Sequence, residues 1–277
     1  MDISAICSNV ERGVDGIWQA RDTPAVSYPA TGHDICFQVE AGSFWFTHRN
    51  ACIEALVRRM PPPGTLFDIG GGNGFVAAGL QASGVDVVLV EPGPAGAANA
   101  RHRGVREVIC ATAESAGIRP GTVPGVGLFD VIEHVSDDGG FLRAMHALLV
   151  PGGRLYATVP AHQWLWSAED VQAGHVRRYT RQTLCAALSS AGFAIDYASC
   201  FFRPLPLPIL LLRALPLRLG LGSTQPAAER ARSAHAVGGG MGRKVVEQLL
   251  GGEVANIARG REMPFGASII LAASRRG

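Results

Sequence analysis

Three glycines at two-residue spacing follow an aspartate, which places Gly70, Gly72 and Gly74 just after Asp68. The residues before this cluster are apolar, and those after it have a helical pattern. Glycine has no Cβ and adopts positive φ, so backbone N–H groups there can approach a ligand closely. Glu91 ends the next apolar run, where a carboxylate can accept hydrogen bonds from both hydroxyls of a ribose. The pattern therefore predicts a site for a nucleotide-type cofactor.

The spacing of the glycines argues against two common nucleotide sites. A P-loop ends in Gly-Lys-Ser or Gly-Lys-Thr, whereas Gly74 is followed by Phe75. A dinucleotide fingerprint needs its third glycine three residues after the second, and counting from Gly72 that position is again Phe75. A glycine turn without any ligand is the remaining alternative.

Alternating apolar runs and helical patterns must position these residues. Continuous apolar strands separated by helices indicate a parallel sheet that is covered on both faces, as in a doubly wound, Rossmann-like α/β fold. The pattern predicts seven strands, at residues 65–70, 85–91, 107–111, 125–132, 154–160, 193–199 and 268–274.

Regions outside these strands suggest four parts of the chain. The sequence predicts an N-terminal cap at residues 1–60 and a cofactor-binding core at residues 61–202. An apolar and helical insertion follows at residues 203–263, between strands six and seven, and residues 264–277 hold the last strand of the core. A glycine-rich linker, HAVGGGMG, lies within the insertion and precedes a helix predicted from Lys244.

The aspartate–glycine pattern, together with Glu91, resembles motifs I and II of the class I S-adenosylmethionine (SAM) methyltransferases. The segments ICATAES, GLFDVIEHVSDD and LLVPGGRLYATVP resemble later parts of the same family. The resemblance covers residues 44–200 well and the last strand moderately. It implies SAM as cofactor and a seventh strand that runs antiparallel between the fifth and sixth.

The resemblance also implies which residues bind SAM. Along the strand ends these are Asp68, Gly70, Gly72, Gly74, Glu91, Pro92 and Asp130. Ala113 and Glu114 are candidates for flanking the adenine, although Thr112 stands where the family often has an aspartate.

The segment FWFTHRN, residues 44–50, resembles one that precedes motif I in a group of bacterial small-molecule methyltransferases. Aromatic faces such as that of Trp45 could shield the sulfonium by cation–π attraction, and Arg49 could pair with the methionine carboxylate. The alternatives are that Trp45 packs the start of a helix and that Arg49 is a solvated charge.

Four residues are candidates for catalysis on the acceptor. His134 follows strand four, where it could act as a base or orient the acceptor, and a structural role is the alternative. The loop after strand five resembles a segment of the same bacterial group and should overhang the acceptor. There Asp170 and His175 offer polar groups, and Tyr179 an aromatic wall, with Trp164 and Trp166. No His, Cys or Asp spacing typical of a metal site is present, so we expect no metal.

Composition limits the partners. Hydrophobic residues make up 47% of the 277 residues and the net charge is +2, which gives no support for nucleic-acid binding. The N-terminus is not a secretory signal and the cysteines form no CxxC pair, so we expect a cytoplasmic protein. Residues 201–222 are apolar but contain arginines and prolines, which favours a buried segment or peripheral membrane contact over a spanning helix.

The leading hypothesis is a biosynthetic methyltransferase that acts on a small molecule, either apolar or carrier-bound. A second hypothesis keeps SAM but not methyl transfer, and includes cyclisation, decarboxylation or cleavage that releases methylthioadenosine. A third is a SAM-binding regulator without activity. The sequence does not give the oligomeric state.

Overall fold

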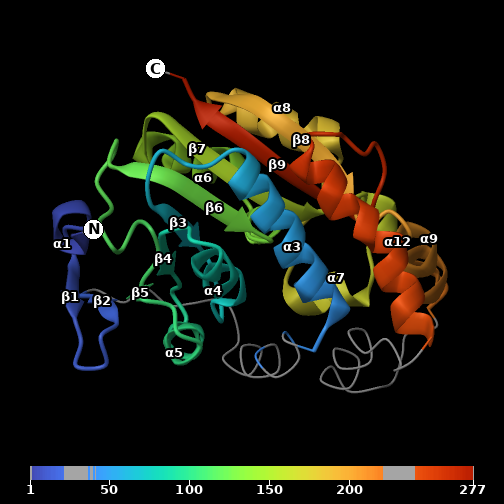
Figure 1. Ribbon diagram of the computed structural model, residues 1–277, viewed down its shortest axis with the longest axis horizontal. Coiled ribbons are helices and arrows are strands. Elements are labelled where there is room, and N and C mark those ends of the chain that lie inside the picture. Colours follow the sequence, from blue (N-terminus) through green and yellow to red (C-terminus); the bar gives the residue numbers. More distant parts are fainter. Residues whose placement is uncertain (1, 22–36, 38–39, 41, 221–240, 277) are drawn as a thin grey trace.

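A nine-stranded sheet forms the centre of the protein. The computed structural model describes residues 2–21, 37, 40, 42–220 and 241–276. The strand order is β1-β2-β5-β4-β3-β6-β7-β9-β8 (Figure 1). The strands are β1 (Val10–Arg12), β2 (Trp18–Ala20), β3 (Leu66–Ile69), β4 (Val87–Val90), β5 (Glu107–Cys110), β6 (Val123–Phe129), β7 (Leu149–Pro160), β8 (Phe193–Phe201) and β9 (Ser268–Arg275).

All seven predicted strands are present, as β3 to β9. Strand β9 pairs antiparallel with both β7 and β8, which confirms the placement of the last strand. The count of seven is wrong, because β1 and β2 form an antiparallel hairpin and β2 adds parallel to β5. The Trp18 indole donates a hydrogen bond of 2.9 Å to Glu107 and ties this hairpin to the sheet. The hairpin covers the β5 side of the sheet, which would otherwise be an open edge.

Side chains of the central strands point alternately to two faces, and each face has its own core. Phe67 and Val88 pack with helices α6 (Asp138–Leu148) and α8 (Arg181–Ser190). Leu66 and Leu89 point the other way, toward α3 (Phe44–Arg59), α4 (Phe75–Ala82), α5 (Pro94–His102) and α12 (Met241–Ala258). This two-layer covering gives the expected Rossmann-like fold, and Figure 1 shows α3 and α12 lying along the same face.

The described chain between β8 and β9 is mostly helical. It forms α9 (Pro206–Ile209), the π-helix η3 (Leu210–Ala214) and α10 (Leu215–Arg218), and later α12. No helix within the described ranges is both long and apolar enough to cross a bilayer. The predicted linker HAVGGGMG spans positions 235–242. Positions 235–240 lie outside the described residues, and positions 241 and 242 begin α12.

Candidate active site

A cavity of about 430 Å³ lies at the carboxyl ends of β3, β4 and β6. The chain runs outward from β3 through β4 to β5 and then returns to β6 on the other side of β3. This reversal is a topological switch point, where ligands bind in open α/β sheets. Residues from all three strand ends line the cavity, and Phe46 and Arg49 of α3 close one side of it.

Gly70, Gly72 and Gly74 in the loop after β3 have positive φ, and Gly72 and Gly74 face different surroundings. A Cβ on Gly72 would meet no atom within 4 Å, so this residue opens directly onto the cavity. A Cβ on Gly74 would lie 2.7 Å from the Cβ of Ala100 and 2.9 Å from a methyl of Val105. Gly72 therefore leaves room for a ligand, whereas Gly74 lets α4 pack closely against α5.

Glu91 shapes the cavity at the end of β4. One of its oxygens accepts a hydrogen bond of 2.9 Å from the backbone N–H of Gly72, and the other accepts one of 2.6 Å from Gly93. The buried carboxylate thus holds the glycine loop and the start of the next loop together. It lines the cavity beside Pro92, as its predicted contact with a ribose requires.

Asp68 is buried at the inner end of the cavity, and neither of its carboxylate oxygens has a hydrogen-bond partner among the described residues. Burial raises its pKa to about 7, while Arg49 opposes this rise and Glu91 adds to it. A cationic group of a bound molecule would satisfy this carboxylate, and SAM carries one on its methionine part. The open wall at Gly72 and the unpartnered Asp68 therefore fit the cofactor that the resemblance implies.

Arg49 forms an ion pair with Asp130, which follows β6. Asp130 has a φ of 58°, a left-handed conformation that is unusual outside glycine, and also accepts a 2.9 Å hydrogen bond from Thr158. The guanidinium of Arg49 lies 5.2 Å from the ring centre of Phe46. Arg49 is thus held at the cavity wall by Asp130, and its Nε is buried without a partner among the described residues.

Four predicted cofactor residues do not line this cavity. Gly74 faces α5 instead, as described above, and the other three are Trp45, Ala113 and Glu114. Trp45 stacks on Phe202, with ring centres 3.9 Å apart, because consecutive positions on α3 point in different directions. Ala113 is packed in the other core, and Glu114 is exposed. Phe46 was missed, although its spacing of three from Arg49 would have placed both on one helical face.

Three of the four predicted catalytic residues lie together. His134 ends a short 3-10 helix, η1 (Ile132–His134), and lines the cavity. Its ring centre is 4.8 Å from that of His175. Asp170, in α7 (Ala168–Ala173), lies 2.8 Å from Nδ1 of His175. Burial and His175 lower the pKa of His134, which favours its neutral form.

Asp170 is the fixed centre of this group. Arg178 donates two hydrogen bonds to its carboxylate, of 2.7 and 2.8 Å, and Ser167 donates two more within the N-terminal cap of α7. Burial opposes ionisation, but the hydrogen bonds from His175 and Arg178 outweigh it and hold the pKa of Asp170 below its usual range. Asp170 therefore orients His175 from behind.

Tyr179 is not part of this group. It is buried in the core on the α8 side, where its hydroxyl donates a 2.6 Å hydrogen bond to Asp138. Burial and this bond raise its pKa. Tyr179 closes the loop after β7 onto the sheet instead of facing the cavity.

Glu133 is a second residue, after Phe46, that sequence reasoning left out of the site. Its carboxylate is fully buried beside the two histidines, and neither oxygen has a partner among the described residues. Burial and the nearby Asp130 raise its pKa well above the usual value. The apolar strand that precedes Glu133 was a signal that it would be buried.

Comparisons with known proteins agree with this geometry. A family model described as a methyltransferase domain matches residues 45–198. A ubiquinone biosynthesis O-methyltransferase of Pseudomonas paraeruginosa is 31% identical over 98 residues, which are 33% of this chain and 42% of that protein. A probable SAM-dependent methyltransferase of Mycobacterium tuberculosis is 27% identical over 184 residues, or 64% and 65% of the two chains. The matches thus span less than two thirds of these relatives.

Solved structures have the same fold. The chain aligns with phosphoethanolamine N-methyltransferase 2 of Haemonchus contortus in complex with SAM at a TM-score of 0.56 and 18% identity, covering 91% of this chain and 58% of that one. A SAM-dependent methyltransferase of Thermotoga maritima aligns at a TM-score of 0.55 and 19% identity. This alignment covers 90% of this chain and 100% of that one. The family match covers more than half of the chain, and the cavity fits the cofactor. The chain therefore belongs to the class I SAM-dependent methyltransferases, and its cofactor is SAM.

Proposed function

We propose that this protein transfers the methyl group of SAM to a hydroxyl of a small apolar molecule in a biosynthetic reaction. The observation that carries this proposal is the position of His134, which lines the cofactor cavity and also contacts His175. Bound SAM supplies an electrophilic methyl group on a sulfonium. An acceptor hydroxyl has to lose its proton as it attacks, and titratable side chains at this wall serve that need.

On this proposal each part of the site has one role. Asp68, Glu91 and the glycine loop bind the cofactor, and Arg49 with Asp130 closes the cavity. His134 and His175, oriented by Asp170, promote loss of the hydroxyl proton. In the transfer an O–CH₃ bond forms, the S–CH₃ bond breaks with its electron pair left on sulfur, and the proton is lost to the buffer.

The preference for an apolar acceptor is supported by the surface beside the site. Leu207, Leu212 and Leu219 of the insertion after β8 are 62%, 75% and 68% exposed. Arg218 donates a 2.7 Å hydrogen bond to the backbone oxygen of Trp164, which joins this insertion to the loop that carries His175. Exposed leucines with nearby arginines are typical of surfaces that lie on anionic membranes, where greasy substrates are found.

A preference for oxygen is supported by the curated relatives that are O-methyltransferases by name. The matched segments are 42% and 38% of those proteins, so the proposal takes from them the acceptor atom alone. We expect the N-terminal cap, residues 1–60, and the insertion, residues 203–263, to select the acceptor.

Methyl transfer is tested by incubating the full chain with SAM and a panel of alkyl-chain phenols, with phosphoethanolamine as an amine control. We expect S-adenosylhomocysteine and the aryl methyl ether of the phenol, which is one methylene heavier than the phenol by mass spectrometry. Methylation of the amine alone would overturn the oxygen preference. Methylthioadenosine formed without any acceptor would overturn methyl transfer itself.

A further inference from the structure

Folding brings three possible metal ligands together at the wall of the cofactor cavity. The ligand atoms of Glu133, His134 and His175 all lie within 4.8 Å of one another. Glu133 and His134 follow β6, whereas His175 comes from the loop after α7. A 2.8 Å hydrogen bond from the backbone N–H of Val176 to the Glu133 carbonyl fixes the two segments to each other. The separation along the chain explains why spacing alone did not predict this cluster.

The Glu133 carboxylate is the strongest sign that the cluster holds a cation. It is 0% exposed, and neither oxygen has a hydrogen-bond partner within the part of the chain that the structure describes. A buried carboxylate without a partner is costly, so native proteins pair such groups or bind a cation with them. The two nearby arginines are engaged elsewhere, Arg49 with Asp130 and Arg178 with Asp170.

His175 is oriented as a metal ligand usually is. Its Nδ1 hydrogen-bonds to Asp170, which leaves Nε2 available on the other side of the ring. Metal-binding histidines commonly use one nitrogen for a carboxylate in this way, which fixes the ring orientation and makes the ligand more basic. Asp170 is itself held by Arg178 and Ser167, so the orientation of His175 is set before any ion binds.

We propose that Glu133, His134 and His175 bind one divalent transition-metal ion, such as Zn²⁺, at the acceptor side of the cofactor cavity. Two imidazoles and one carboxylate are the protein ligands of many catalytic zinc sites, which keep a further position open. Because His134 lines the cavity, an ion held by these residues would lie at the wall of the space where the acceptor is proposed to bind. The ion favours the ionised hydroxyl, and this catalytic part rests on the proposed function.

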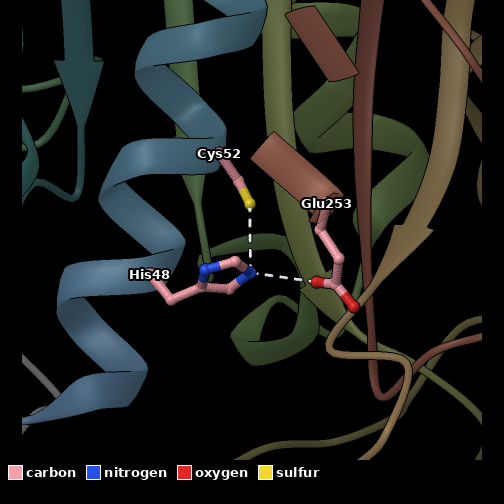
Figure 2. Close-up of side chains that lie close together, drawn as sticks. All are labelled: His48, Cys52 and Glu253. Atoms are coloured by element: carbon pink, nitrogen blue, oxygen red, sulfur yellow. Dashed lines mark hydrogen bonds and ion pairs between the residues drawn. The ribbon is translucent and has the colours of Figure 1, made fainter. Parts of the chain in front are cut away.

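A second cluster provides a contrast within the same chain. His48, Cys52 and Glu253 also approach one another, as Figure 2 shows. The Glu253 carboxylate, however, already accepts hydrogen bonds of 2.8 Å from the backbone N–H groups of Phe202 and Arg203 and lies 2.9 Å from Nε2 of His48. Its charge is satisfied, so we assign this cluster a structural role.

The test is a Co²⁺ titration of the full chain after removal of metal by a chelator. We expect one tightly bound Co²⁺ with visible d–d absorption and no band from a thiolate ligand. Glu133→Gln and, separately, His175→Ala should each weaken Co²⁺ binding at least about tenfold. Cys52→Ser is the matched control and should leave binding unchanged. Circular dichroism checks that each variant is folded. If Glu133→Gln or His175→Ala does not fold, His134→Ala takes its place in the titration.

The outcomes separate this inference from the proposed function. Co²⁺ binding that Glu133→Gln and His175→Ala leave unchanged, or a thiolate band that Cys52→Ser removes, would overturn the metal site. Methyl transfer that persists in chelator, without any Co²⁺ binding, would overturn it and leave the proposed function intact. If the natural protein binds Co²⁺ and the variants do not, but no acceptor is methylated, the metal site is supported and the result counts against the proposed function.

Discussion

At the scale of single residues, short-range pattern predicted the cofactor end of the cavity better than the acceptor end. The glycines, Asp68 and Glu91 lie at the carboxyl ends of two neighbouring strands, so their meeting at one sheet edge could be expected from strand order. Glu133 was not predicted as a site residue, because its role depends on His175, which reaches it only through folding. Trp45 was predicted to face the cofactor, but Phe46 lines the cavity instead. The rotation of α3 about its axis decides which of these two adjacent rings faces the cavity, and the sequence did not give it.

Asp68 should make the stability of the ligand-free protein depend on pH. Its pKa is about 7 in the folded state, compared with 3.8 for an ordinary aspartate. Between these values the folded state keeps a proton that the unfolded state has lost, so stability falls as pH rises from about 4 to 7. A difference of about three pKa units corresponds to roughly 4 kcal/mol at most. We expect Asp68→Asn to be more stable than the natural protein at pH 8, with a difference that shrinks toward pH 4.

Urea denaturation at several pH values measures this effect, with Asp86→Asn as a control because Asp86 is exposed on the surface. A difference between Asp68→Asn and the natural protein that stays constant from pH 4 to pH 8 would contradict the assignment. Saturation with SAM should remove most of the advantage of the variant at pH 8, because a cationic ligand stabilises the ionised carboxylate.

At the scale of elements, the seven strands β3 to β9 could be predicted because each contains a mainly apolar run. The β1–β2 hairpin could not, since its strands have three residues each and carry polar side chains that give no alternation. The order of the strands came from the family resemblance alone. Contacts of the insertion with the rest of the protein were also beyond the sequence, because they join α12 to α3 across about 200 positions of the chain.

Glu253 should hold α12 in place. It joins this helix to α3 through His48 and to the end of β8 through the N–H groups of Phe202 and Arg203. Glu253→Ala leaves these buried donors without an acceptor, so we expect a loss of about 3–5 kcal/mol in the free energy of unfolding. Glu262→Ala is the matched control, because the Glu262–Arg181 ion pair is exposed and should contribute less than about 1 kcal/mol.

Denaturation curves of the two variants give the comparison directly. Equal losses for Glu253→Ala and Glu262→Ala would show that the buried contacts of Glu253 do not hold the helix. Amide hydrogen exchange adds the location, since the loss of protection in Glu253→Ala should be greatest in α12 and at the end of β8.

At the scale of the whole molecule, the site and the apolar surface are parts of one arrangement. The loop after β7 carries His175 beside the cavity and Trp164 at the surface. Trp164 and Phe265 stack nearly parallel, with an angle of 11° between their rings and His162 next to both. A hydrogen bond from Arg218 to the backbone oxygen of Trp164 joins this loop to the insertion, whose exposed leucines form an apolar surface.

We predict that this surface binds anionic membranes. Leu211 and Leu212 are exposed on η3, and Arg203 and Arg218 flank them in the chain. The double substitution Leu211→Glu with Leu212→Glu removes apolar contact and adds negative charge, so binding to anionic vesicles should fall at least about tenfold. Val14→Glu is the control, because Val14 is also an exposed apolar residue but lies between β1 and β2, away from the insertion.

Vesicle co-sedimentation with phosphatidylglycerol and with neutral phosphatidylcholine measures this binding. The natural protein should prefer the anionic vesicles, and the preference should weaken at high salt because the arginines act through screened charges. Both variants should bind SAM with unchanged affinity, since none of the three substituted positions lines the cofactor cavity. If Val14→Glu lowers vesicle binding as much as the double substitution does, the insertion is not the membrane surface, and the preference for a greasy acceptor loses its structural support.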